Sequence, residues 1–172
     1  MSVLQKLYFY SMKKLLLYIF LLGLPASLIA QKSSRYFFIR HAEKVLNVKN
    51  PDLTPKGKER AQEWADMFQH YKIDKVLSTD YKRTIQTAQP IATKNRVRVE
   101  KYNPRKFDVA KFLQATKGKN VVIVGHSNST PTLVNSFLKK NKYQQIDEKI
   151  YGNLYILTIK DGDINDLLLT VK

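Results

Sequence analysis

Short apolar runs and stretches of helical periodicity alternate along residues 35–172. Four apolar runs predict strands, at 36–39, 75–77, 97–102 and 121–124. Helices are predicted between and after these runs, over 54–71, 81–94, 107–116 and 129–140. Thr54 and Pro55 supply an N-cap and a first-turn proline to the first helix. An alternation of this kind is typical of a sheet that is covered by helices.

The C-terminal part of the pattern adds a hairpin. Two further strands, 154–159 and 166–171, flank Asp161-Gly162, a dipeptide that favours a tight turn. The run at 121–124 is continuous and β-branched, as expected of a parallel strand that is buried on both faces. The sequence therefore predicts an α/β fold, a three-layer sandwich with a mostly parallel central sheet and a C-terminal antiparallel hairpin.

Residues 1–30 follow a different pattern. They contain three lysines and no acidic residue, and their apolar run from Leu15 to Ala30 is interrupted by Gly23 and Pro25. A membrane-spanning helix needs about 20 apolar residues, whereas a basic start, a short apolar core and a small-residue end are typical of a signal peptide. We therefore predict a signal peptide at 1–30, cleaved after Ala30, and one domain at 31–172.

A signal peptide implies export, to the periplasm or the extracellular space, with no stable membrane insertion after cleavage. The alternative location is a membrane to which an uncleaved N-terminal segment anchors the protein. A buried helix is a third interpretation of the same residues. A lipoprotein is excluded because no cysteine follows the apolar run.

Composition limits the chemistry of the domain. The chain of 172 residues has no cysteine, which excludes disulfides, thiolate zinc sites and cysteine nucleophiles. Three of its 30 Lys and Arg residues precede residue 31, so 27 cations against 14 acids give the remainder a net charge of +13. A basic surface attracts anions, but no nucleic-acid motif accompanies the charge, and we expect no nucleic-acid partner.

Three predicted strands end in polar clusters. Arg40-His41 follows the first strand, Ser78-Thr79-Asp80 the second and Gly125-His126-Ser127 the strand at 121–124. Arg83 lies one helical turn after the second cluster. Ligands bind beyond the carboxyl ends of parallel strands, so we expect these clusters to meet in one pocket.

The chemistry of such a pocket is narrow. Two guanidiniums and two imidazoles suit a tetrahedral dianion, because arginine presents planar forks to phosphate oxygens. A neutral imidazole can attack phosphorus and divide one difficult hydrolysis into two steps through phosphohistidine. The cations and the second imidazole would stabilise the charge on the equatorial oxygens.

At these residues the sequence resembles the histidine phosphatase superfamily, in its phosphoglycerate mutase-like and small phosphohistidine phosphatase-like branch. Arg-His-Ala-Glu at 40–43 resembles the first-histidine signature of that family, with Ala42 in place of the usual glycine. Leu-Thr-Pro-Lys-Gly at 53–57, the segment 78–88 and Gly-His-Ser at 125–127 resemble three further motifs, in family order.

The resemblance implies a role for each matching residue. His41 would be the phosphorylated nucleophile, and Arg40, Arg83 and His126 would form the catalytic phosphate pocket. Two further positions, Asn47 and Ser127, would contact the substrate phosphate. The resemblance implies no metal and no cofactor.

The proton donor to the leaving group is the least defined part of the site. Many family members place a glutamate between the arginine element and the second histidine, where this chain offers Glu100 and Asp108. Glu100 falls in a predicted strand, so Asp108 is the candidate, with Glu43 as the other. A plain helix-terminal acid is the alternative role for Asp108. Without a donor, activity would be limited to good leaving groups.

We therefore expect an exported histidine-type phosphatase that hydrolyses a small phosphomonoester or other phosphorylated substrate through phospho-His41. A phosphomutase is one alternative. The other is a non-catalytic module that binds phosphorylated or anionic ligands. The sequence makes no prediction of oligomeric state.

Overall fold

The computed structural model describes residues 3–22 and 33–171. The chain divides into two units, residues 1–30 and residues 31–172, and each is described by itself. The described part of the first unit is the helix α1 (Val3–Leu22), and the predicted cleavage site after Ala30 lies outside the described residues. Within the two described ranges, no helix combines the length and the hydropathy needed to cross a membrane.

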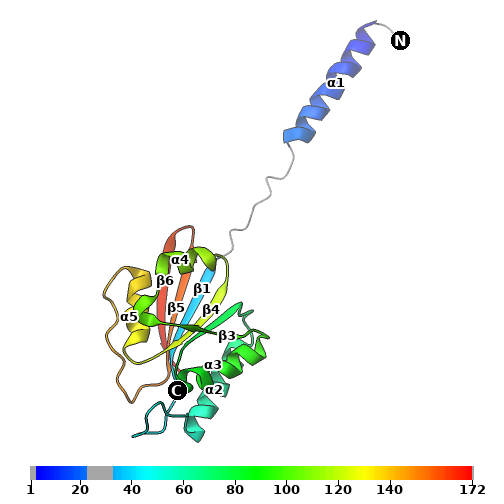
Figure 1. The fold of residues 1–172 in the computed structure, drawn as a ribbon. Helices are drawn as coiled ribbons and strands as arrows, with labels where there is room; N and C mark the ends of the chain where they lie inside the picture. Colours follow the sequence, from blue (N-terminus) through cyan, green and yellow to red (C-terminus); the bar gives the residue numbers. More distant parts are fainter. Residues whose placement is uncertain (1–2, 23–32, 172) are drawn as a thin grey trace. The chain divides into compact units, whose positions relative to one another are not determined.

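The second unit is built on one six-stranded sheet (Figure 1). Its strands are β1 (Ser34–Arg40), β2 (Lys75–Thr79), β3 (Val99–Tyr102), β4 (Asn120–Gly125), β5 (Asn153–Lys160) and β6 (Asp163–Thr170). They lie in the order β3-β2-β4-β1-β5-β6. Strands β1 to β4 pair in parallel, while β5 is antiparallel to β1 and β6 is antiparallel to β5. The predicted mostly parallel sheet with a C-terminal hairpin is confirmed.

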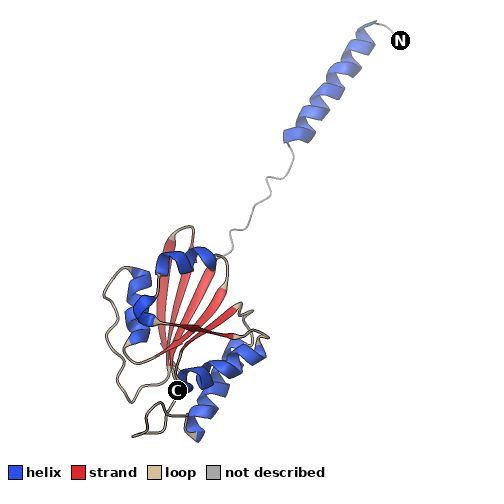
Figure 2. Ribbon diagram, viewed as in Figure 1, coloured by secondary structure: helices blue, strands red, loops and turns tan. Residues whose placement is uncertain are grey.

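Helices flank the sheet (Figure 2). They are α2 (Pro55–Phe68), α3 (Lys82–Lys94), α4 (Val109–Ala115) and α5 (Ser129–Leu138), with a 3₁₀ turn at Pro104–Lys106. The two faces of β1 show how the layers form, because successive side chains of a strand point to opposite faces. Phe37 packs in the core under α2 and α3, whereas Phe38 packs in the core under α5. The arrangement is the predicted three-layer sandwich.

Local chemistry accounts for where the helices begin and end. The hydroxyl of Thr54 accepts the Gly57 backbone N–H at 3.0 Å, which caps α2 ahead of Pro55 as predicted. Pro90 lies inside α3 and does not end it, because the residues after it, Ile91 and Ala92, are fully buried against the sheet.

The C-terminal hairpin depends on two residues with positive φ. Asp161 has φ 54° and Gly162 has φ 93°, and both are needed for the twist of a two-residue turn between antiparallel strands. The turn joins β5 to β6, so Lys160 pairs with Asp163 across the two strands, and this pair sets the register of the hairpin. The hairpin completes the sheet on the side away from β3.

Candidate active site

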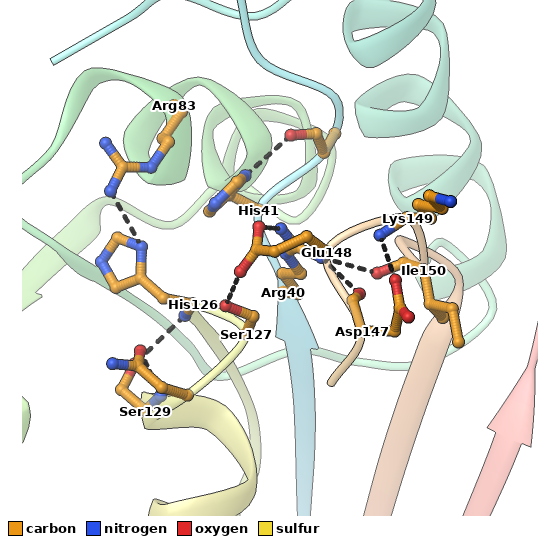
Figure 3. Close-up of polar contacts among 12 residues, drawn as sticks. Arg40, His41, Arg83, His126, Ser127, Ser129, Asp147, Glu148, Lys149 and Ile150 are labelled. Carbon is orange, nitrogen blue, oxygen red and sulfur yellow. Dashed lines mark hydrogen bonds and ion pairs between the residues drawn. The ribbon is translucent and has the colours of Figure 1, made fainter. Parts of the chain in front are cut away.

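The carboxyl ends of two neighbouring parallel strands, β1 and β4, bring the two histidines together. Register pairs Arg40 at the end of β1 with Gly125 at the end of β4, and the residue after each strand is a histidine. The rings of His41 and His126 lie 5.5 Å apart, centroid to centroid, at an interplanar angle of 67°. The predicted meeting of these two residues is therefore what the fold produces (Figure 3).

His41 has one ring nitrogen free for nucleophilic attack. The side chain is 3% exposed, and its Nδ1 lies 2.8 Å from the Ala42 carbonyl oxygen. A carbonyl can only accept, so Nδ1 carries the hydrogen and Nε2 carries the lone pair. Burial is the main cause that lowers the His41 pKa to about 3, aided by the charges of Arg40 and Arg83 and opposed by the Ala42 hydrogen bond. The ring is therefore neutral near pH 7.

His126 is fixed at both ring nitrogens. Arg83 Nη2 donates to its Nδ1 at 3.2 Å, so the hydrogen lies on Nε2, which donates to Thr79 Oγ1 at 2.9 Å. Thr79 Oγ1 in turn donates to Thr84 Oγ1 at 3.0 Å, and that hydroxyl donates to a backbone carbonyl. Burial, followed by the charges of Arg83 and Arg40, lowers the His126 pKa to about 4. Thr84 thus belongs to the support of this ring.

Arg40 is fully buried and held by the segment 147–151. Its Nη1 donates to the carbonyl oxygens of Asp147 and Ile150, both at 2.9 Å. Its Nη2 forms an ion pair with the Glu148 carboxylate, and the guanidinium carbon lies 4.4 Å from the Tyr151 ring centroid. These contacts fix the guanidinium at the base of the site.

The two arginines have unused hydrogen-bonding capacity. Among the described residues, the Nε atoms of Arg40 and Arg83 are buried without a partner. Buried N–H groups without a partner are costly, and a charged oxyanion is a strong acceptor for guanidinium. Both arginines therefore suit an anionic ligand.

A pocket of about 1020 Å³ opens over this cluster. His41, Arg83 and His126 line it, together with Ser127 and Glu148. Within the described residues, no group of three or more His, Cys, Asp or Glu is arranged to hold a metal ion. The arrangement combines a neutral imidazole with guanidiniums, and it suits nucleophilic attack on a bound oxyanion.

Two of the motifs hold the backbone beside His41. The Thr87 hydroxyl accepts the Ala42 N–H at 3.0 Å. At Gly57, a Cβ atom would lie 2.1 Å from the carbonyl oxygen of Glu43, so only glycine permits α2 to pack this close to the loop. These two contacts fix the backbone beside His41.

Four predicted positions are not among the residues that line the pocket: Arg40, which is buried, and Asn47, Asp108 and Glu43. Asn47 has a left-handed φ of 58° in an exposed loop. Asp108 caps α4, accepting the Lys111 N–H at 3.0 Å, which is the structural role left open for it. Glu43 is paired with Arg60, at 2.9 Å. The structure brings neither carboxylate to the site.

Ser127 lines the pocket, as the sequence predicted. Its hydroxyl donates a hydrogen bond to the carboxylate of Glu148, a residue that the sequence did not single out. Glu148 lies in the loop before β5, far along the chain from both arginines and outside the segment that the family motifs cover. No local pattern marked it, because its position depends on how that loop folds back over Arg40.

Burial of neutral His41 makes stability depend on pH. Between pH 6.5 and the folded pKa of about 3, the unfolded chain binds a proton at this residue and the folded chain does not. Stability therefore falls as pH drops through this window, by about 2 kcal/mol for this group between pH 7 and pH 5. Urea unfolding at both pH values should show His41→Gln losing less stability than the wild type. Equal losses in the two proteins would contradict the assignment.

Comparison with known proteins finds the same family that the motifs resemble. The model of the histidine phosphatase superfamily (branch 1) matches residues 36–103. No curated protein matches the chain. Among solved structures, the protein histidine phosphatase SixA complexed with tungstate is 17% identical, with a TM-score of 0.61 over 79% of this chain and 96% of that one.

Two other enzymes share the fold. Mycobacterial glucosyl-3-phosphoglycerate phosphatase Rv2419c is 14% identical, with a TM-score of 0.64 over 80% of this chain and 98% of its own. Phosphoserine phosphatase from Entamoeba histolytica, in complex with 3-phosphoglyceric acid, is 16% identical, with a TM-score of 0.60 over 81% and 98%. The chain is thus similar to the histidine phosphatase superfamily over residues 36–103, and it shares its fold with these phosphatases.

Proposed function

We propose that the protein is an exported phosphatase that hydrolyses a small phosphorylated molecule through a phosphohistidine on His41. The observation that carries the proposal is the buried, neutral His41 ring, whose Nε2 is free while Arg40, Arg83 and His126 surround it. The match of residues 36–103 to the superfamily model and the shared fold support phosphatase or mutase activity in general. The nucleophile, the direction of transfer and export are the parts that this proposal adds.

The reaction follows from the protonation states of the two rings. The lone pair on His41 Nε2 attacks phosphorus, the bond from phosphorus to the leaving group breaks, and the phosphoryl group remains on Nε2. Water then attacks phosphorus, and the bonding pair returns to Nε2 as phosphate leaves. Arg83 and Arg40 stabilise the charge on the phosphoryl oxygens in both steps.

Hydrolysis is favoured over a mutase reaction by the short segment between His41 and Leu53, which contains no insertion large enough to enclose a sugar-acid phosphate. Export is supported by the basic start and the interrupted apolar run of residues 1–30. An exported enzyme is separated from intracellular sugar phosphates. Both arguments support release of phosphate to water.

The experiment is phosphate release from an activated aryl phosphate by the purified protein, followed by an alkaline quench that preserves phosphohistidine. We expect turnover, with an acid-labile phosphate on the peptide that contains His41. Transfer to an added sugar-acid acceptor in place of release would indicate a mutase. Tight binding of phosphate without turnover would indicate the non-catalytic module and contradict the proposal.

A further inference from the structure

The loop before β5 places a carboxylate in the pocket beside the phosphate-binding cations. Glu148 pairs with Arg40 Nη2 and accepts the hydroxyl hydrogen of Ser127, and Figure 3 shows its side chain pointing toward these two partners. Its side chain is 63% exposed, so it remains accessible from the pocket that it lines. Its carboxylate therefore lies at the wall of the pocket, next to Arg40 and Ser127.

The other acidic residue of the pocket lining and the acidic candidates that precede the second histidine pair with other groups. Asp80 also lines the pocket, but its carboxylate is paired with Lys101 at 2.7 Å. Glu100 pairs with Lys75 at 2.5 Å on the edge strand β3. Asp108 and Glu43 are a helix cap and an ion-pair partner outside the pocket lining. Among the described residues, Glu148 is thus the pocket acid in direct contact with a phosphate-site arginine.

We propose that Glu148 is the proton donor to the leaving group. This inference rests on the phosphatase function proposed above and supplies the acid that the sequence did not reveal. Glu148 follows the second histidine in the sequence, in the loop that leads into the C-terminal hairpin, whereas both carboxylates that the sequence favoured precede that histidine.

In the free protein Glu148 is ionised. The hydrogen bond from Ser127 and the charge of Arg40 hold its pKa below the usual range, with a smaller contribution from Lys44. The charged and titratable groups that face it also include Arg83 and His126. Cations therefore outnumber the single carboxylate in this part of the pocket, and the free site keeps a net positive charge.

A bound phosphate changes this balance. Arg40 Nη1 is already occupied by two carbonyl oxygens, so a phosphate oxygen would compete with Glu148 for the rest of the same guanidinium. Two anions that share one site cannot both remain ionised at low cost, and the pKa of the weaker acid rises. Substrate binding is therefore expected to protonate Glu148, at the place where the leaving oxygen gains charge.

The proton balance then closes over the two steps. As His41 Nε2 bonds to phosphorus, the bond to the leaving oxygen breaks and the Glu148 proton moves to that oxygen, giving an alcohol and a carboxylate. In the second step the carboxylate accepts a proton from the attacking water. The bond from phosphorus to Nε2 breaks and Glu148 is protonated again. It releases this proton to solvent as phosphate leaves, which restores the ionised carboxylate of the free protein.

The test is the leaving-group dependence of Glu148→Gln, measured with the full chain on a series of aryl and alkyl phosphates. A general acid contributes about 10²–10⁴-fold, and it matters most when the leaving group is a poor one. We expect kcat for phenyl or alkyl phosphate to fall by about that factor, and kcat for an activated aryl phosphate to change by less than about threefold. Glu100→Gln, the same substitution on an exposed ion pair, is expected to match the wild type on every substrate.

Three results would overturn the proposal. An equal loss on all substrates would show that Glu148 only positions Arg40. Faster turnover and tighter inhibition by inorganic phosphate, without leaving-group dependence, would show a carboxylate that merely blocks the site. Transfer of the leaving-group dependence to Asp80→Asn would assign the donor to that residue. Loss of activity on the activated substrate in His41→Ala tests the underlying function separately.

A second measurement, the pH dependence of kcat, needs only the wild-type protein and no variant. In the wild type, kcat for phenyl phosphate should fall on the alkaline side as Glu148 in the bound complex loses its proton. The activated substrate, which needs no acid, should lack this limb. Identical profiles for both substrates would also overturn the proposal.

Discussion

Replacing His41 by alanine is expected to lower kcat for an activated aryl phosphate by about 10⁴-fold or more, because the substitution removes the atom that forms the bond to phosphorus. Loss of a nucleophile is not compensated by the groups around it, which act together with it. Phosphate release and the acid-labile phosphoenzyme should disappear together. Arg40, Arg83 and His126 remain, so inorganic phosphate is still expected to bind.

His70→Ala is the matched control for this variant. His70 is an exposed histidine after the end of α2, and its ring contacts only the neighbouring Gln69 among the hydrogen bonds of the described residues. We expect full activity in that variant. Persistent turnover in a folded His41→Ala protein, at more than about 1% of the wild type, would contradict the phosphohistidine mechanism.

Replacing Arg83 by methionine should lower kcat/KM by about 10²–10³-fold, the range for loss of one preorganised donor to developing charge. Arg83 lies half-buried at the start of α3, and its Nη2 also fixes the His126 ring at 3.2 Å. Methionine keeps much of the volume but has neither the charge nor the planar fork. Lysine at this position is not expected to restore activity, because a point charge cannot replace both contacts.

Inorganic phosphate as a competitive inhibitor gives an independent measurement of the same effect. Its inhibition constant should rise in Arg83→Met, since the substitution removes a cation from the oxyanion site. Arg98→Met, at an exposed arginine just before β3, is the control and should leave both quantities unchanged. Equal behaviour of the two variants would show that Arg83 does not contact the phosphate.

The order of strands and helices was predictable because each element is encoded in its own residues. The β-branched run at 121–124 specified a buried strand, and Thr54 with Pro55 specified a helix start, both independently of the rest of the chain. The short helix predicted over 107–116 begins later, at Val109, because Asp108 caps it. Boundaries of this kind depend on which side chain reaches a free backbone N–H.

The central part of the candidate site was also predictable, for a topological reason. His41 and His126 both follow strands, and parallel strands place their carboxyl ends at one edge of the sheet. Arg40 and Arg83 are adjacent to these strand ends in the chain, so the same rule brings them in. Proximity of four residues therefore followed from local sequence and one general property of parallel sheets.

The sequence by itself thus determined the elements, their order and the residues at the strand ends. Only the tertiary structure decided which acid lies in the pocket. Glu148 reaches Arg40 across 108 positions of sequence, and the loop that carries it is held by the buried guanidinium rather than by its own periodicity. Strands and helices are specified by short-range patterns, but the path of a loop is set by the partners it meets when the chain is folded.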